Sequence, residues 1–141
     1  NNFQIDSPSL SYDDLIQPGP LNPDALRYEQ HRVWVVEATL KPDERHIYAK
    51  RVFYIDEDTW QISLAEQYDA RGQLWRVSEG FMIPLYDRKI PWLAAESISD
   101  LSNGRYSVFG LRNEINSPIE FGFTASSSEY TPNALRNSGV R

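Results

Sequence analysis

Few side chains in this sequence are suited to acid–base or metal chemistry. There are two histidines, His31 and His46, and no cysteine. Together with Asp43, Glu44 or Glu29 the histidines could form a weak metal site, because imidazole and carboxylate groups are common cation ligands. Histidines near an exposed loop are far more often solvated, and serine nucleophile elbows, glycine-rich phosphate loops and paired metal histidines are missing. We therefore predict no metal ion and no cofactor.

Carboxylates occur in two further patterns. Asp56-Glu57-Asp58 resembles a calcium-binding run, but it lacks the spacing and glycine of an EF-hand loop, so we interpret it as a solvated turn. Glu66 and Glu79 could form the carboxylate pair of a glycoside hydrolase. Only generic aromatic residues accompany them, and these do not identify a sugar site. The sequence therefore predicts a protein that is not an enzyme.

Length and composition indicate one domain. Of 141 residues, 40% are hydrophobic and 24% are charged, which is ordinary for a globular chain. The formal net charge is −6 and there is no basic stripe, so we expect no nucleic-acid partner. No apolar run approaches the ~20 residues of a membrane-spanning helix. The chain begins at Asn1 without an initiator methionine, and we expect a processed product or a fragment.

Alternating apolar and polar residues predict β-strands in the middle of the chain. Between residues 60 and 68 apolar side chains recur at every second position except at Glu66, which indicates one buried and one solvated face. Asn103-Gly104 between two such segments is a strong hairpin signal. We predict a mainly β fold with little helix, an antiparallel sheet with strands at residues 27–40, 46–55, 60–68, 74–85, 95–101 and 105–114, and an irregular crossing at 86–95.

The two ends of the chain are expected to differ from the sheet domain, which we place at 27–125. Residues 1–26 contain four prolines, and we interpret them as an extended arm across the domain, with one helical turn at 11–16. A solvated tail is the alternative. The tail at 126–141 should contain a short helix that begins at Thr131-Pro132. Apolar residues on both faces of the first two strands indicate that both sides of that part are covered.

Two hairpin registers predict which side chains share a face. We expect Ile55 to face Trp60 and Ala70 to face Gln73, and opposed residues share a face. One buried face should then include Trp60 and a lining suited to an acyl chain, which needs no directional hydrogen bonds. That lining consists of Phe53, Ile62, Leu64, Val77, Phe81 and Ile83.

The same register places charge inside this apolar face, on Arg51, Glu66 and Glu79. Burying these charges unpaired would be very costly. We therefore expect a structural ion pair of Arg51 with Glu66 or Glu79. The alternative is a polar anchor for the head group of a ligand in an apolar groove.

Several segments resemble a known family. These are RYE at 27–29, HRVWVVEATL at 31–40, HIYAKR at 46–51, FYIDEDTW at 53–60 and YTPNALR at 130–136. They resemble the C-terminal half of the domain of unknown function 1329, a proteobacterial envelope family. That family is similar in fold to the lipoprotein-sorting carriers LolA and LolB, in which a curved antiparallel half-barrel holds acyl chains. The resemblance identifies no catalytic residue, and without the N-terminal half the sheet would expose an edge.

The resemblance and the apolar face together predict a function. We expect a non-catalytic module of a Gram-negative envelope, in the periplasm or at the periplasmic face of the outer membrane, that binds or transfers a lipid or other hydrophobic ligand. Its other partner would be the N-terminal half of the parent protein or another envelope protein. The alternative is a structural or interaction domain of outer-membrane assembly or transport machinery.

Overall fold

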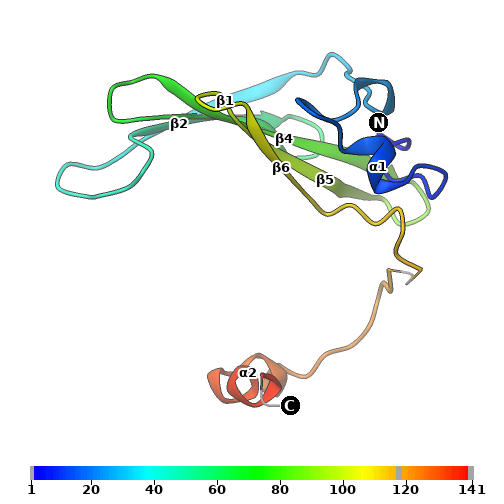
Figure 1. Cartoon of the computed structure of the whole chain (residues 1–141). Helices are drawn as coiled ribbons and strands as arrows, with labels where there is room; N and C mark the ends of the chain where they lie inside the picture. Colours follow the sequence, from blue (N-terminus) through cyan, green and yellow to red (C-terminus); the bar gives the residue numbers. More distant parts are fainter. Residues whose placement is uncertain (1, 117–118, 140–141) are drawn as a thin grey trace.

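The structure, a computed structural model, describes residues 2–116 and 119–139 and is dominated by one open antiparallel sheet (Figure 1). Its six strands follow the sequence order from edge to edge. They are β1 (Val33–Thr39), β2 (Lys50–Asp56), β3 (Ile62–Tyr68), β4 (Leu74–Leu85), β5 (Ile90–Asp100) and β6 (Arg105–Phe109). The short helices are α1 (Tyr12–Leu15), η1 (Pro23–Ala25), η2 (Ser127–Tyr130) and α2 (Pro132–Ser138). The mainly β, curved antiparallel fold is therefore confirmed. None of the helices in the described ranges has the length and apolarity needed to cross a membrane.

The strand boundaries agree with the sequence patterns in part. β4 spans the predicted residues, and Gly104 adopts a left-handed conformation in the predicted β5–β6 hairpin. The irregular crossing at 86–95 is wrong, because β5 already begins at Ile90 and Pro84 lies opposite Pro91. At Pro84 and Pro91, β4 and β5 have no further neighbour, because β3 and β6 pair with other parts of these strands. The missing proline N–H groups therefore break no hydrogen bonds to β3 or β6.

The register of the first hairpin differs from the prediction. Trp60 does not face Ile55: it lies in the turn with a left-handed φ of 59° and is 70% exposed. Ile55 pairs with Ile62 instead, and Arg51 pairs with Gln67. The predicted register placed Arg51 opposite Leu64, three residues before Gln67 in β3. A register shift by an odd number of residues moves side chains to the other face of the sheet. The predicted register of the second hairpin is confirmed for the pairs Leu64–Glu79 and Glu66–Val77. Next to the turn it is wrong, because a register shift after Gln67 pairs Tyr68 with Leu74 and the Asp69 N–H bonds the Gln73 carbonyl oxygen.

The core lies between the sheet and residues 2–26, which we call the arm. Four arm residues are buried against Phe81, Ile83, Ala94 and Ala95 of β4 and β5: Ile5, Leu15, Leu21 and Ala25. We call this face of the sheet the arm-side face, and the other the opposite face. The predicted helical turn is α1, where Ser11 and Asp14 form a capping box that satisfies the first backbone N–H groups. Asn113 fastens the arm by donating to the carbonyl oxygens of Ile5 and Ser7, at 2.9 and 2.8 Å.

The β1 side of the sheet is uncovered in the part of the chain that the structure describes. Trp34, Val35 and Val36 are 55%, 62% and 43% exposed. The arm and the tail, as far as residues 2–116 and 119–139 describe them, therefore do not supply the cover expected for this region; sequence outside this chain, the other source that was expected, stays a prediction. The tail extends away from the sheet and ends in α2 (Figure 1), which Thr131 caps by accepting a hydrogen bond from the Ala134 N–H at 3.1 Å, as predicted.

Candidate functional site

The arm-side face holds most of the predicted apolar lining, but the arm divides it into two parts. Phe81 and Ile83 are only 3% and 2% exposed because the arm covers them. Leu64 and Val77 are half-buried and lie outside that core cluster. Phe53 and Ile62 do not belong to this face: Phe53 alternates with Val52 and Tyr54, and Ile62 pairs with Ile55 across a β-bulge.

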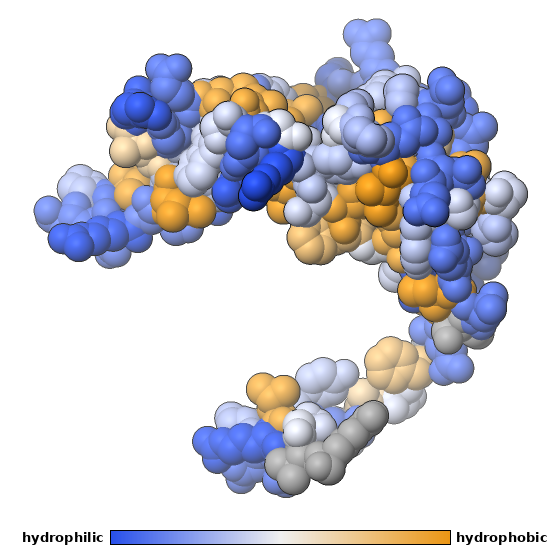
Figure 2. All heavy atoms as spheres, viewed as in Figure 1, coloured by the Kyte–Doolittle hydropathy of each residue, from blue (hydrophilic) through white to orange (hydrophobic). Residues whose placement is uncertain are grey.

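The uncovered part of this face is an apolar row. Val35 of β1 pairs with Tyr54 of β2, Tyr54 with Leu64 of β3, and Leu64 with Glu79 of β4. We call Val35, Tyr54, Leu64 and the neighbouring Val77 the arm-side patch. In the view of Figure 2, apolar residues reach the surface over the sheet instead of being enclosed. The sequence did not predict Tyr54 as part of this surface, because the first-hairpin register was misjudged.

Glu66 and Glu79 border the arm-side patch and accept hydrogen bonds from tyrosines. The Tyr68 hydroxyl donates to Glu66 Oε2 at 2.6 Å, and the Tyr28 hydroxyl donates to Glu79 Oε1 at 3.1 Å. The bond to Glu66, together with burial, raises the pKa of Tyr68 to about 12. Burial and the charge of Glu79 raise the pKa of Tyr28 to about 12. Both phenols therefore remain neutral donors at physiological pH.

The predicted ion pair of Arg51 with Glu66 or Glu79 is wrong. The observed register places Arg51 opposite Gln67 and Glu66 opposite Val52, so the arginine and the two glutamates lie on different faces. The guanidinium of Arg51 instead lies 5.6 Å from the centre of the Phe53 ring. A cation held over an aromatic face gains a modest electrostatic attraction.

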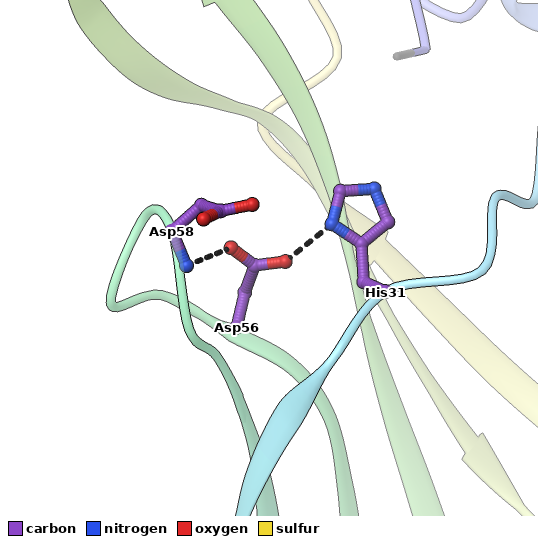
Figure 3. Close-up of side chains that lie close together, drawn as sticks. All are labelled: His31, Asp56 and Asp58. Carbon is purple, nitrogen blue, oxygen red and sulfur yellow. Dashed lines mark hydrogen bonds and ion pairs between the residues drawn. The ribbon is translucent and has the colours of Figure 1, made fainter.

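The predicted grouping of His31 with His46 is not the one that the structure shows. His31 lies near Asp56 and Asp58 (Figure 3). One candidate ligand atom from each of the three residues lies within 4.8 Å of the others. His31 Nδ1 is 2.6 Å from Asp56 Oδ2, and Asp56 Oδ1 accepts bonds from the Asp58 N–H and from the N–H and hydroxyl of Thr59. Both carboxylate oxygens of the buried Asp56 are thus already used. The arrangement fixes the β2–β3 turn against the start of β1, which is a structural role.

We expect Asp56→Ala to destabilise the protein by about 1–3 kcal/mol, because the variant leaves the turn N–H donors without their acceptor. Burial raises the pKa of Asp56, but the hydrogen bonds from Thr59 and Asp58 outweigh it and lower the pKa below its ordinary value of 3.8. Stabilisation by the ionised group is therefore present above about pH 4 and lost as pH falls through the folded-state pKa. Urea denaturation at pH 7 and at pH 3 should show the difference between wild type and variant shrinking with acid.

The matched control for that prediction is Asp58→Ala, which removes a carboxylate of the same turn that is exposed. Its side chain should contribute less than about 0.5 kcal/mol. Equal losses in the two variants would contradict the structural role assigned to Asp56.

Two surface hollows lie away from the arm-side patch. One, of about 230 Å³, is formed beside the arm by Asn2, Phe3, Gln4, Ala25 and Arg27. The other, of about 340 Å³, lies on β4–β6, with charged residues such as Arg76 and Asp100 and apolar residues such as Ile98 and Phe109 in its wall. Neither is lined by a residue of the predicted apolar lining, so we do not place the ligand site in them.

Comparisons with known proteins agree with this architecture. The family model "Protein of unknown function (DUF1329)" matches residues 1–136. An uncharacterized protein of Pseudomonas aeruginosa is 52% identical over all 141 residues, which are 31% of its own length. The chain therefore spans about a third of that curated relative.

Two solved structures are also similar. A Vibrio parahaemolyticus domain named for outer membrane lipoprotein sorting aligns with a TM-score of 0.52 and 17% identity, over 74% of this chain and 42% of that one. A protein of the same DUF1329 family from Desulfovibrio piger aligns with a TM-score of 0.47 and 17% identity, over 73% and 40% of the two chains. The first likeness shows a shared fold.

Proposed function

The chain belongs to the DUF1329 family, and from this premise we propose that it is a non-catalytic module of an envelope protein that binds a lipid or another hydrophobic ligand on its arm-side face. The observation that supports this most is the apolar row of the exposed Val35 and the half-buried Tyr54 and Leu64, which lies outside the core cluster on an open sheet. The sheet has the fold of a domain named for lipoprotein sorting, and that likeness also favours a location in the periplasm or at the outer membrane.

The chemistry of the arm-side patch suits an acyl chain. Its aliphatic and aromatic side chains offer dispersion contacts along several strands, and each buried methylene of a ligand contributes roughly 0.8 kcal/mol. Glu66 and Glu79, held by Tyr68 and Tyr28, form the polar border at which a ligand head group would end. Phe81 and Ile83 serve the ligand site indirectly, by fixing the arm that closes one end of the row.

A titration with Nile red, an uncharged apolar dye, tests this proposal. We expect saturable fluorescence enhancement by the native protein, and competition by dodecanol, because both molecules would occupy one finite apolar surface. Enhancement that rises linearly without saturation, or that dodecanol leaves unchanged, would contradict a ligand site on the sheet.

The second candidate function is an interaction domain, and the exposed β1 edge favours it. Trp34 and Val36 are exposed on the opposite face beside Val35 on the arm-side face, and an uncovered strand edge is a template for pairing with another strand. In this case the remainder of the parent protein, or another envelope protein, would cover β1. Protection of the β1 amides from hydrogen exchange in the longer parent protein, without saturable dye binding there, would favour this function over ligand binding.

A further inference from the structure

Acidic side chains border the arm-side patch. Glu79 lies directly opposite Leu64, the centre of the patch, and Glu66 lies two residues beyond Leu64 on the same strand and face. Opposed residues have Cβ atoms about 5 Å apart, and alternate residues of one strand are about 7 Å apart. Glu37 of β1 lies in the same row as Glu66, with Val52 between them. A head group beside Leu64 would therefore lie next to two carboxylate side chains.

The two glutamates beside the patch centre have no cationic partner in the described parts of the chain. Within residues 2–116 and 119–139, no lysine, arginine or histidine lies at ion-pair distance from Glu66 or Glu79. The groups that donate to them are hydroxyls, from Tyr68 to Glu66, and from Tyr28 and Ser97 to Glu79. These donors are neutral, so they hold the two carboxylates without cancelling their charge.

The sheet separates charge between its two faces. The strand register places the following charged residues on the arm-side face: Glu37, Asp56, Glu66, Glu79 and Lys50. The charged residues that it places on the opposite face are Arg51, Arg76 and Arg105, with Glu96 and Asp100. The arm-side face is therefore the negative one, and a ligand whose charge complements it is a cation.

Lys50 gives an example, within the chain, of the kind of ion that suits this face. Its Nζ lies 3.5 Å from Glu37 Oε2 and 4.3 Å from the centre of the Tyr68 ring. Proteins hold alkylammonium groups in this way, by the charge of a carboxylate and by the negative face of an aromatic ring. Glu66 lies beside the same kind of ring, because burial and the nearby charge of Glu66 raise the pKa of Tyr54. A further ammonium group would meet the same chemistry at Glu66.

We propose that the arm-side patch selects amphiphiles whose head group is an ammonium cation and disfavours those with an anionic head group. This inference rests on the proposed function, because it concerns the head group of the same ligand. The apolar part would lie along Val35, Tyr54 and Leu64, and the ammonium group would lie beside Glu66 or Glu79. One unit charge about 7 Å from another changes an affinity by roughly threefold even in a water-like environment, so two carboxylates give about tenfold.

Displacement of bound Nile red by three amphiphiles of equal chain length tests the inference. They are dodecyltrimethylammonium, dodecanol and dodecanoate, each used below the concentration at which it forms micelles, at pH 7 and low salt because salt screens charges. We expect the ammonium compound to displace half of the dye at about a tenfold lower concentration than dodecanol, and dodecanoate to need a higher one. Tetramethylammonium, which has the head group without the chain, should displace no dye.

The outcomes separate this inference from the proposed function. Equal potency of the ammonium compound and dodecanol, or greater potency of dodecanoate, would overturn the selectivity and leave the ligand site in place. Displacement by tetramethylammonium would also overturn it, since the head group would then bind without the apolar patch. If none of the three dodecyl compounds displaced the dye, the proposed function would fail, and this inference with it.

A matched pair of variants tests the location. Glu66→Gln removes one charge beside the patch and keeps an oxygen that can accept from the Tyr68 hydroxyl. It should reduce the preference for the ammonium compound over dodecanol by about threefold, and because this preference is a ratio, a general loss of binding cancels. Glu96→Gln removes the same charge from the opposite face, where Glu96 is half-buried like Glu66. It should leave the preference within about 1.5-fold of wild type.

Equal changes in the two variants would show attraction by the net charge of the chain and overturn the assigned location. Glu79→Gln, with the same expected effect as Glu66→Gln, serves as the test if Glu66→Gln does not fold. Circular dichroism of each variant establishes whether it folds.

Discussion

Leu15→Ala is expected to destabilise the protein by about 2–5 kcal/mol, the usual cost of removing a fully buried leucine from a packed core. Leu15 has no exposed surface and lies in the cluster that joins the arm to Phe81 and Ile83. The loss of its side chain would therefore loosen the contact that holds the arm on the sheet. Urea denaturation followed by tryptophan fluorescence measures the change.

The adjacent residue provides the control for this experiment. Ile16 is 49% exposed, and Ile16→Ala should cost less than about 1 kcal/mol because little apolar surface is lost. If Leu15→Ala were as mild as Ile16→Ala, the arm would not be docked on the sheet, and the division of the arm-side face into covered and uncovered parts would be wrong.

Leu64→Lys is expected to weaken Nile red binding by at least about tenfold. Leu64 lies in the middle of the arm-side patch, between Tyr54 and Glu79, and an ammonium group there cannot be desolvated beneath an apolar ligand without a large cost. The half-buried position lets the lysine direct its charge into water, so the fold should persist. Circular dichroism and a thermal melt of the variant establish this, and Leu64→Ala, with a smaller loss of binding, serves if the lysine variant unfolds.

Val36→Lys is the matched control for the ligand site. It places the same charge on the edge strand β1, two strands from Leu64, at a 43% exposed aliphatic residue of the opposite face. Dye binding should remain within about twofold of wild type. Equal loss in both variants would mean that the dye does not distinguish the two faces, which contradicts a site on the arm-side patch.

Much of the fold was predictable from local patterns, whereas the site depended on one turn. Polar reversals at Gly72 and Gly104 fixed the β3–β4 and β5–β6 hairpins, because glycine adopts the left-handed φ that both turns require. The β2–β3 turn was misjudged because Asp56 accepts three hydrogen bonds from Asp58 and Thr59 and lengthens the loop. Trp60 consequently leaves the strand.

That one error explains why the predicted site residues lie on two different faces of the sheet. A shift of three residues moved Arg51 and Phe53 away from Leu64, Glu66 and Glu79, since side chains alternate between faces. Asp56 is also held by His31, which precedes β1 and is distant in sequence. The alternation of apolar and polar residues contains no information about such a contact. The sequence could therefore predict an apolar face that contains charged residues, but not which charged residues lie on that face.

Native mass spectrometry of the full-length protein, purified without detergent, tests the proposed ligand binding most directly. The account predicts a co-purified hydrophobic molecule that is lost in the Leu64→Lys variant and kept in the Val36→Lys variant. A full-length protein that shows no bound lipid and no saturable uptake of apolar probes would contradict it, and the interaction domain would replace it as the function of this sheet.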